Sequence, residues 1–143
     1  MLTRMTLDEM NAFSAGTLME QLGIVFTEIG EDYLCGSMPV DHRTKQPAGL
    51  LHGGASVALA ETLGSMGSMS LVDLSSHAIV GVEVNANHIR KATDGHVHGK
   101  ATIVMRSRKL HVWEIKIHND AGALTCLSRL TIMVLEKPQN EHA

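Results

Sequence analysis

One stretch of this chain decides its fold, and it reads Gly53-Gly54-Ala55-Ser56-Val57-Ala58-Leu59-Ala60-Glu61-Thr62-Leu63-Gly64-Ser65-Met66. Its small and apolar residues, with no proline among them, predict one long helix that reaches to about Met69. Small side chains let other backbone segments come close. We therefore expect the helix to be covered on most of its sides.

Glu61 is the one charged residue of this stretch. Burying an unpaired carboxylate costs several kcal/mol, so Glu61 either lies at the helix edge in water or serves a function. Ser65 follows one turn later on the same face, where its hydroxyl could orient the carboxylate or an attacking water. The pattern makes Glu61 a candidate catalytic residue.

The segments on either side of the helix predict an antiparallel sheet. Thr6-Leu7-Asp8-Glu9 has the form of a capping box that opens a short helix through Phe13, and Thr17-Leu18-Met19-Glu20 repeats the signal, so the N-terminal helical segment is predicted over 6–22. Strands are expected over 23–29, 33–40, 79–89, 95–106, 110–118 and 124–135. The element order predicts an α+β fold, with a sheet of five or six strands wrapped around the long helix. We expect one domain over 1–143 with a polar tail at 137–143.

Composition argues against several classes of protein. The net charge is −3 and the chain has only four aromatic residues, two Phe, one Trp and one Tyr, so nucleic-acid binding is not expected. No stretch approaches the ~18 apolar residues of a membrane span. Cys35 and Cys126 are solitary and are expected to be reduced thiols. These features favour a cytoplasmic protein without membrane contact.

Other catalytic patterns are incomplete. A serine nucleophile elbow would need a second glycine after Ser56. His96 and His98 share a strand face, with His111 or His118 near in sequence, but no cysteine or carboxylate set completes a zinc site. We expect no metal.

The start of the long helix predicts a site shared between two chains. Its free backbone N–H groups favour developing negative charge, and Gly53 and Gly54 let a substrate approach them, although glycine at a loop-to-helix junction often serves backbone geometry alone. Gly53 and Glu61 lie eight residues apart, which is ~12 Å along one helix. If they act on one carbonyl, Glu61 of one subunit must face Gly53 of another. We therefore expect a dimer at least.

Several motifs resemble those of the hotdog-fold acyl-CoA thioesterases. They are Asp41-His42-Arg43-Thr44-Lys45-Gln46-Pro47-Ala48-Gly49-Leu50-Leu51-His52-Gly53-Gly54-Ala55-Ser56, Leu59-Ala60-Glu61-Thr62-Leu63-Gly64-Ser65, Gly81-Val82-Glu83-Val84-Asn85-Ala86-Asn87-His88 and Ser128-Arg129-Leu130-Thr131. The likeness covers nearly the whole chain. It is closest to the branch that contains the 1,4-dihydroxy-2-naphthoyl-CoA thioesterase and the proofreading thioesterase of enterobactin synthesis, related to the 4-hydroxybenzoyl-CoA thioesterases of the Arthrobacter type.

The resemblance implies a hotdog fold and a role for each matching residue. It implies that Glu61 is the catalytic nucleophile or general base and that the Gly53 amide polarises the thioester carbonyl across a subunit interface. Gln46 would orient water or the leaving thiol, and His52 would position the thioester, whereas without the resemblance His52 is better read as a capping histidine. Substrate contacts are expected at Ser65, Gly81, His88, Ile89, Arg90, Lys91, Arg106, Ser107 and Arg108. Two features depart from the family pattern: Ala48 stands where an aromatic residue is usual, and the segment from Met105 to Leu110 is more basic.

The activity implied is hydrolysis of an aromatic acyl-CoA, of the hydroxybenzoyl or hydroxynaphthoyl type, with coenzyme A as part of the substrate and no other cofactor. A homotetramer built from two dimers and a place in menaquinone biosynthesis are further implications. Two alternatives stay open: a thioesterase acting on acyl or aroyl carrier protein, and a hotdog module that binds or senses acyl-CoA without hydrolysing it.

Overall fold

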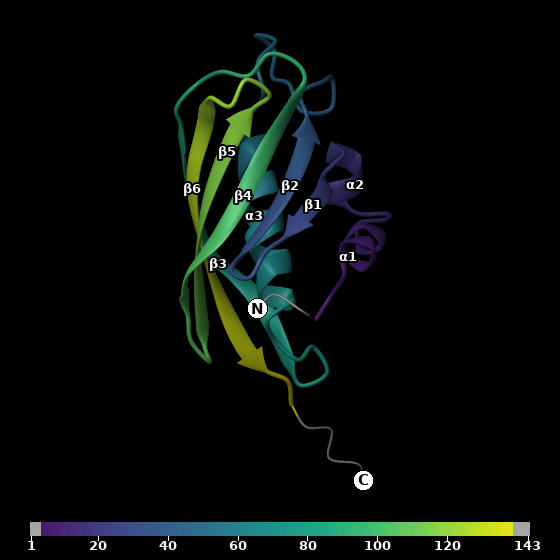
Figure 1. Ribbon diagram of the computed structural model, residues 1–143, viewed down its shortest axis with the longest axis vertical. Coiled ribbons are helices and arrows are strands. Elements are labelled where there is room, and N and C mark those ends of the chain that lie inside the picture. Colours follow the sequence, from purple (N-terminus) through teal and green to yellow (C-terminus); the bar gives the residue numbers. More distant parts are fainter. Residues whose placement is uncertain (1–3, 139–143) are drawn as a thin grey trace.

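The computed structural model describes residues 4–138, so most of the predicted polar tail lies outside the described residues. One antiparallel sheet holds six strands in the order β1-β2-β4-β5-β6-β3. These are β1 (Val25–Ile29), β2 (Tyr33–Pro39), β3 (His77–His88), β4 (His96–Arg106), β5 (Leu110–Asn119) and β6 (Leu124–Glu136). The sheet curves around the long helix α3 (Gly53–Met69), as Figure 1 shows. The predicted hotdog architecture is confirmed.

Close approach between α3 and the sheet depends on glycine. A Cβ on Gly64 would lie 2.5 Å from Leu130 Cδ2, and one on Gly67 would lie 2.6 Å from the Trp113 ring. A glycine of the sheet has the same effect, because a Cβ on Gly99 would lie 2.6 Å from Leu63 Cδ1. The small residues of the helix therefore let its axis lie close to the strands.

The core lies between the sheet and α3. Trp113, Ile115 and Ile117 of β5 are all fully buried, which confirms the predicted alternation along that strand. Trp113 Nε1 donates a hydrogen bond to Ser68 Oγ at 2.8 Å, so the one tryptophan is bonded to the helix that it packs against. The core thus fixes how α3 is seated on the sheet.

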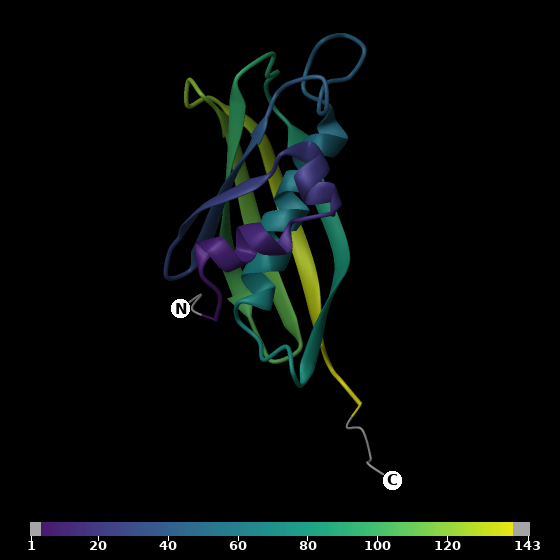
Figure 2. The same ribbon diagram turned by 90° about the vertical axis from the view of Figure 1, so that its right-hand side faces the viewer.

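Two short helices, α1 (Leu7–Phe13) and α2 (Leu18–Leu22), lie within the predicted helical segment 6–22, and α1 ends at Phe13 as predicted. Both capping signals are used, since the Thr6 side chain accepts from the Glu9 amide and the Thr17 side chain accepts from the Met19 amide. Figure 2 shows both helices in front of α3, on its side away from the sheet. They cover only part of that side.

The side of α3 next to β3 is open. The twelve-residue strand β3 is the edge of the sheet, so no further strand continues the sheet around the helix there. Val82 on this strand is 53% exposed. Such an edge presents unpaired backbone groups and is a ready surface for pairing with another strand. The predicted coverage of α3 on most sides is therefore incomplete in a single chain.

Among residues 4–138, no helix is both long enough and apolar enough to span a membrane.

Candidate active site

Glu61 lies over a hollow of about 290 Å³ on the open side of α3. Ser65 lines the same hollow, as expected from its place one turn later. The rest of the lining is mostly apolar and comes from α1, α2 and α3: Phe13, Leu18, Met19, Ala58, Thr62, Met66 and Met69. In the single chain Glu61 is exposed, so the expectation of a buried carboxylate is not met within one protomer. The small and apolar residues around Glu61 in the sequence are therefore explained by the apolar hollow beside it, and not by burial of Glu61 inside the fold.

Two histidines pack against the first turn of α3. His52 is the N-cap, and its Nδ1 accepts a hydrogen bond from the Gly54 amide at 2.8 Å. The capping reading of His52 is thus confirmed. A Cβ on Gly53 would lie 2.7 Å from His88 Nε2, so the imidazole of β3 occupies the space that a side chain would need. Only glycine lets His88 lie this close to the helix start.

A second hollow, of about 350 Å³, opens beside this helix start. It collects six of the predicted site residues, namely Gln46, Gly53, His88, Ile89, Arg90 and Lys91. The Gln46 side chain accepts a hydrogen bond from the Ala48 amide, which holds its loop in a turn. Arg90 donates to the Leu124 carbonyl at 3.3 Å and stays exposed. Helix amides and cations therefore converge here, an arrangement suited to a carbonyl oxygen and to phosphate.

The two hollows share no lining residue. One carries the carboxylate, and the other carries the amide end of the helix. A single chain therefore keeps the Glu61 carboxylate and the amide end of the helix in separate hollows.

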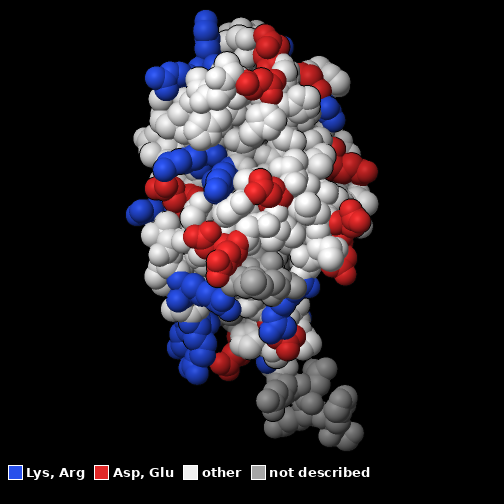
Figure 3. Space-filling view, in the orientation of Figure 1, with Lys and Arg blue, Asp and Glu red and all other residues white. Residues whose placement is uncertain are grey.

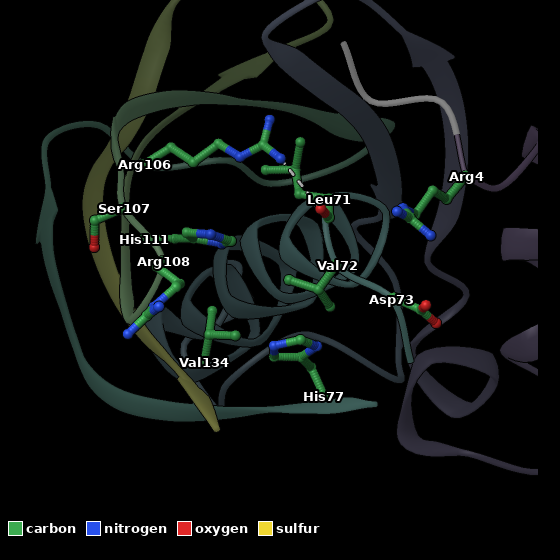
Figure 4. Close-up of a pocket in the computed structure, with 10 residues that line it drawn as sticks. All are labelled: Arg4, Leu71, Val72, Asp73, His77, Arg106, Ser107, Arg108, His111 and Val134. Carbon is green, nitrogen blue, oxygen red and sulfur yellow. Dashed lines mark hydrogen bonds between the residues drawn. The ribbon is translucent and has the colours of Figure 1, made fainter. Parts of the chain in front are cut away.

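Arg106, Ser107 and Arg108 line a third hollow, of about 480 Å³, at the far end of α3. Figure 4 shows their side chains with those of Arg4, His77 and His111 around the end of the helix. Arg106 Nη2 donates to the Leu71 carbonyl at 3.2 Å, just beyond the helix C-terminus. In Figure 3, basic side chains also gather at the end of the sheet that carries the β4–β5 turn. This hollow would suit an anion but lies apart from the other two.

Buried His111 lines this third hollow with a lowered pKa. Desolvation is the main cause, and the nearby positive charge of Arg106 adds to it. The ring Nδ1 lies 3.1 Å from Ser68 Oγ. Neutral His111 therefore belongs to the polar contacts that anchor β5 to α3.

The strand histidines do not gather into a metal site. His98 pairs with Asp120 at 2.7 Å on the outer face of the sheet, whereas His111 lies inside the core. Within residues 4–138, no group of three or more His, Cys, Asp or Glu side chains is placed to hold a metal ion.

Comparison with known proteins identifies the family. Residues 48–126, more than half of the chain, match the thioesterase superfamily. The chain belongs to that superfamily. It is therefore a thioester hydrolase.

The chain is similar to relatives over nearly its full length. It is 48% identical to the proofreading thioesterase EntH of Cronobacter sakazakii, over 92% of this chain and 95% of the relative. It is 45% identical to the 1,4-dihydroxy-2-naphthoyl-CoA hydrolase of Escherichia coli, over 92% of this chain and 96% of that protein. A crystal structure of a mutant of thioesterase PA1618 from Pseudomonas aeruginosa superposes with a TM-score of 0.91 at 45% identity, covering 93% of this chain and 96% of the other.

Sequence patterns missed the apolar wall beside Glu61. Phe13 and Leu18 line this hollow, and their large apolar side chains are 56% and 64% exposed. Neighbouring exposed apolar side chains often mark a binding surface. The available signal was the nine methionines, of which Met19, Met66 and Met69 lie in this wall. Their place beside the carboxylate depends on how α1 and α2 pack on α3, which no local pattern states.

Proposed function

We propose that this thioester hydrolase cleaves aromatic acyl-CoA thioesters, of the hydroxybenzoyl or hydroxynaphthoyl type, at a site that two protomers build together. The observation that carries the proposal is the division of the site. Glu61 stands over an apolar hollow that suits an acyl group, while the Gly53 amide opens into a separate polar hollow. Hydrolysis of a thioester carbonyl needs both the carboxylate and the amide donor close to it, so neither hollow is sufficient alone.

The β3 edge supplies the means of joining the halves. His88 at one end of β3 lies beside Gly53, and Gly81 nearer the other end lies beside Glu61. If two copies pair along β3 in antiparallel fashion about a twofold axis near the middle of the strand, each His88 end comes to the Gly81 region of its partner. Two equivalent composite sites result. The exposed side of Glu61 is then covered by the second protomer.

Within the composite site, each residue has a role set by its chemistry. The Gly53 amide, at the positive end of α3, stabilises the oxyanion that forms on the thioester carbonyl. Glu61 of the other protomer attacks the carbonyl carbon or takes a proton from water that attacks it. Gln46 and Ser65 orient the water or the leaving thiol, and His52 keeps the helix start in place through Gly54.

The phosphates of coenzyme A call for cations and N–H donors. His88, Arg90 and Lys91 offer these next to Gly53, and Arg106 with Arg108 offers a second set at the far end of α3. Because the twofold arrangement brings opposite ends of neighbouring chains together, both sets can serve one substrate.

The aromatic preference is supported by the apolar wall and by the relatives. One relative is named for a dihydroxynaphthoyl-CoA substrate. Flexible methionine side chains adapt well to a flat aromatic acyl group.

Hydrolysis consumes only the thioester and water, so the proposal includes no cofactor beyond the coenzyme A of the substrate. It also includes a cytoplasmic location and a tetramer of two dimers, and a carrier-protein thioester is the alternative substrate.

The test is thiol release from benzoyl-, hydroxybenzoyl-, hydroxynaphthoyl- and fatty acyl-CoA and from an aroyl carrier protein. We expect turnover to be fastest with aromatic acyl-CoA and Glu61→Gln to lower kcat by at least about 10²-fold, because the amide can neither attack nor accept a proton. Glu114→Gln is the matched control, since Glu114 lies on β5 and pairs with Lys116. Its activity should stay within about twofold of wild type.

Undiminished turnover by Glu61→Gln would contradict the assigned role. Binding of acyl-CoA without thiol release across the panel would favour the sensing alternative. After a single turnover in H₂¹⁸O, label in the Glu61 carboxylate identifies a nucleophile, because water has then opened the acyl anhydride at the Glu61 carbonyl. Trapping of the anhydride detects a nucleophile when water attacks the acyl carbonyl instead, whereas a general base forms no anhydride.

A further inference from the structure

Gly81 of β3 lies directly beside the Glu61 carboxylate. A Cβ on Gly81 would lie 3.0 Å from Glu61 Oε1, and no other contact within 4 Å is found for it among residues 4–138 beyond its own chain neighbours. A methyl group at this position would therefore meet one atom, the oxygen of the candidate catalytic side chain.

Backbone geometry does not explain the glycine. Gly81 is not among the glycines with positive φ, so alanine could adopt its conformation. Glycine in the interior of a strand lowers stability, because it loses more freedom on folding and has no side chain to pack. Because no conformational need accounts for this glycine, the space that it leaves for the Glu61 carboxylate is the explanation that the geometry offers.

The local irregularity of β3 falls at the same point. The pairing of β3 with β6 shifts register between Gly81 and Glu83, which leaves Val82 as the extra residue of a bulge. Bulges redirect side chains and are frequent beside active sites. The register shift and the missing side chain therefore mark one place on the strand, and that place faces Glu61.

We propose that Gly81 is a positioning residue for Glu61. By lacking a side chain, it lets the carboxylate lie against the β3 backbone, where Glu61 is held in the orientation from which it reaches the thioester. The sequence resemblance implied a substrate contact at Gly81, whereas the structure assigns it a steric role toward the acid. This inference rests on the proposed catalytic role of Glu61.

The consequence is a selective effect on the chemical step. A methyl group on Gly81 would push Oε1 away by a few tenths of an ångström, and small misplacements of reacting groups have large kinetic effects. We expect Gly81→Ala to lower kcat about tenfold and to leave KM within about twofold. The thermal midpoint of unfolding should stay the same or rise, because alanine suits a strand better than glycine.

Val80→Ile is the matched control. It adds one methyl group on the neighbouring residue, whose Cα partner on β6 is the 40% exposed Met133 on the face away from α3. This variant should keep wild-type kcat. Size-exclusion chromatography with light scattering on all variants checks that the oligomer is unchanged.

A double-mutant cycle adds a readout that a purely structural role would not move. Aspartate at position 61 is one methylene shorter and withdraws the carboxylate from the strand. Glu61→Asp lowers activity by itself, but Gly81→Ala should then have little further effect on kcat, because the added methyl no longer meets the oxygen.

Wild-type kcat in Gly81→Ala, with Glu61→Gln inactive, would overturn the positioning role and leave the proposed function intact. Equal effects of Gly81→Ala in the glutamate and aspartate backgrounds would also overturn it, as would a loss of activity that accompanies a lower unfolding midpoint or a dissociated oligomer. Retained activity in Glu61→Gln would remove the basis of both proposals.

Discussion

Among single residues, Ser68 is the point where the buried polar contacts between α3 and β5 meet. Its hydroxyl oxygen accepts from Trp113 Nε1 at 2.8 Å and lies 3.1 Å from His111 Nδ1. All three residues are at most 2% exposed. A buried polar group that is fully hydrogen-bonded stabilises one packing arrangement, whereas a group that loses its partner costs about 1–3 kcal/mol.

This contact predicts a pH dependence of stability. The pKa of His111 is lowered in the folded protein, so the unfolded chain binds a proton more readily. Stability is therefore fully present above the ordinary histidine pKa of about 6.5 and is lost as the pH falls through the folded pKa. We expect the free energy of unfolding, measured by urea titration, to fall between pH 7 and 5, with a contribution from His111 below about 1.4 kcal/mol per pH unit.

The control for this prediction is His111→Gln, which can still hydrogen-bond Ser68 but does not titrate. Its stability should change less with pH over the same range. Asp41, Asp73 and Asp120 have pKa values lowered by hydrogen bonds, so their contributions are lost at more acidic pH and do not obscure the comparison. Identical slopes in the two proteins would contradict the role given to His111.

At the same scale, sequence reasoning found Glu61 but not its setting. A lone carboxylate in a run of small residues is visible without a structure. Its neighbours Phe13, Met19 and Gly81 come from three other elements, 20 to 48 residues away along the chain. Their proximity to Glu61 is set by tertiary packing, which periodicity and capping signals do not encode.

Among elements, the boundaries that sequence patterns predicted best have strong local signals. The long helix was predicted to end at about Met69 and does so, and the last three strands begin and end within one residue of their predicted limits. The clearest differences are the starts of β1 and β3, which are predicted at residues 23 and 79 but lie at Val25 and His77. Gly23 is the left-handed C-cap of α2, with φ of 68°, so β1 begins only after it, which composition alone does not reveal.

Helix α3 depends on a close fit to the sheet, and Gly67 tests it. Alanine has the better helix propensity by about 1 kcal/mol, yet its Cβ would lie 2.6 Å from the buried Trp113 ring. Because Trp113 is fully enclosed and bonded to Ser68, we expect overpacking to outweigh propensity. Gly67→Ala should lower the free energy of unfolding by about 1–3 kcal/mol in urea denaturation.

Ser65→Ala is the comparison within the same helix, on the face that opens toward the Glu61 hollow. It should stabilise the protein slightly, because alanine is the stronger helix former and no packed neighbour opposes it. If Gly67→Ala stabilised the protein to the same extent, Trp113 would not be held as closely as the structure indicates.

For the whole molecule, the proposed division of the site between two protomers leads to a complementation experiment. Glu61→Gln removes the carboxylate half, and Gln46→Ala weakens the half beside Gly53. Each variant alone should have low activity. In a mixed dimer, one site combines both substitutions, while the other takes Glu61 from the Gln46→Ala chain and Gln46 from the Glu61→Gln chain, so it is intact.

Co-expression of the two variants under different affinity tags, followed by two-step purification, isolates assemblies that contain both chains. Their kcat per chain should recover to at most about half of the wild-type value, since each mixed dimer has one complete site and a dimer of one variant has none. Two wild-type chains, each with one of the tags, are co-expressed and purified in the same way, and their kcat is the reference value. A site contained within one chain would give only the mean of the two variants' low activities, because no protomer in the mixture would carry both functional groups. Recovery of activity would thus require that Glu61 and Gln46 act from different protomers, which is the arrangement that the open β3 edge and the exposed carboxylate of the single chain call for.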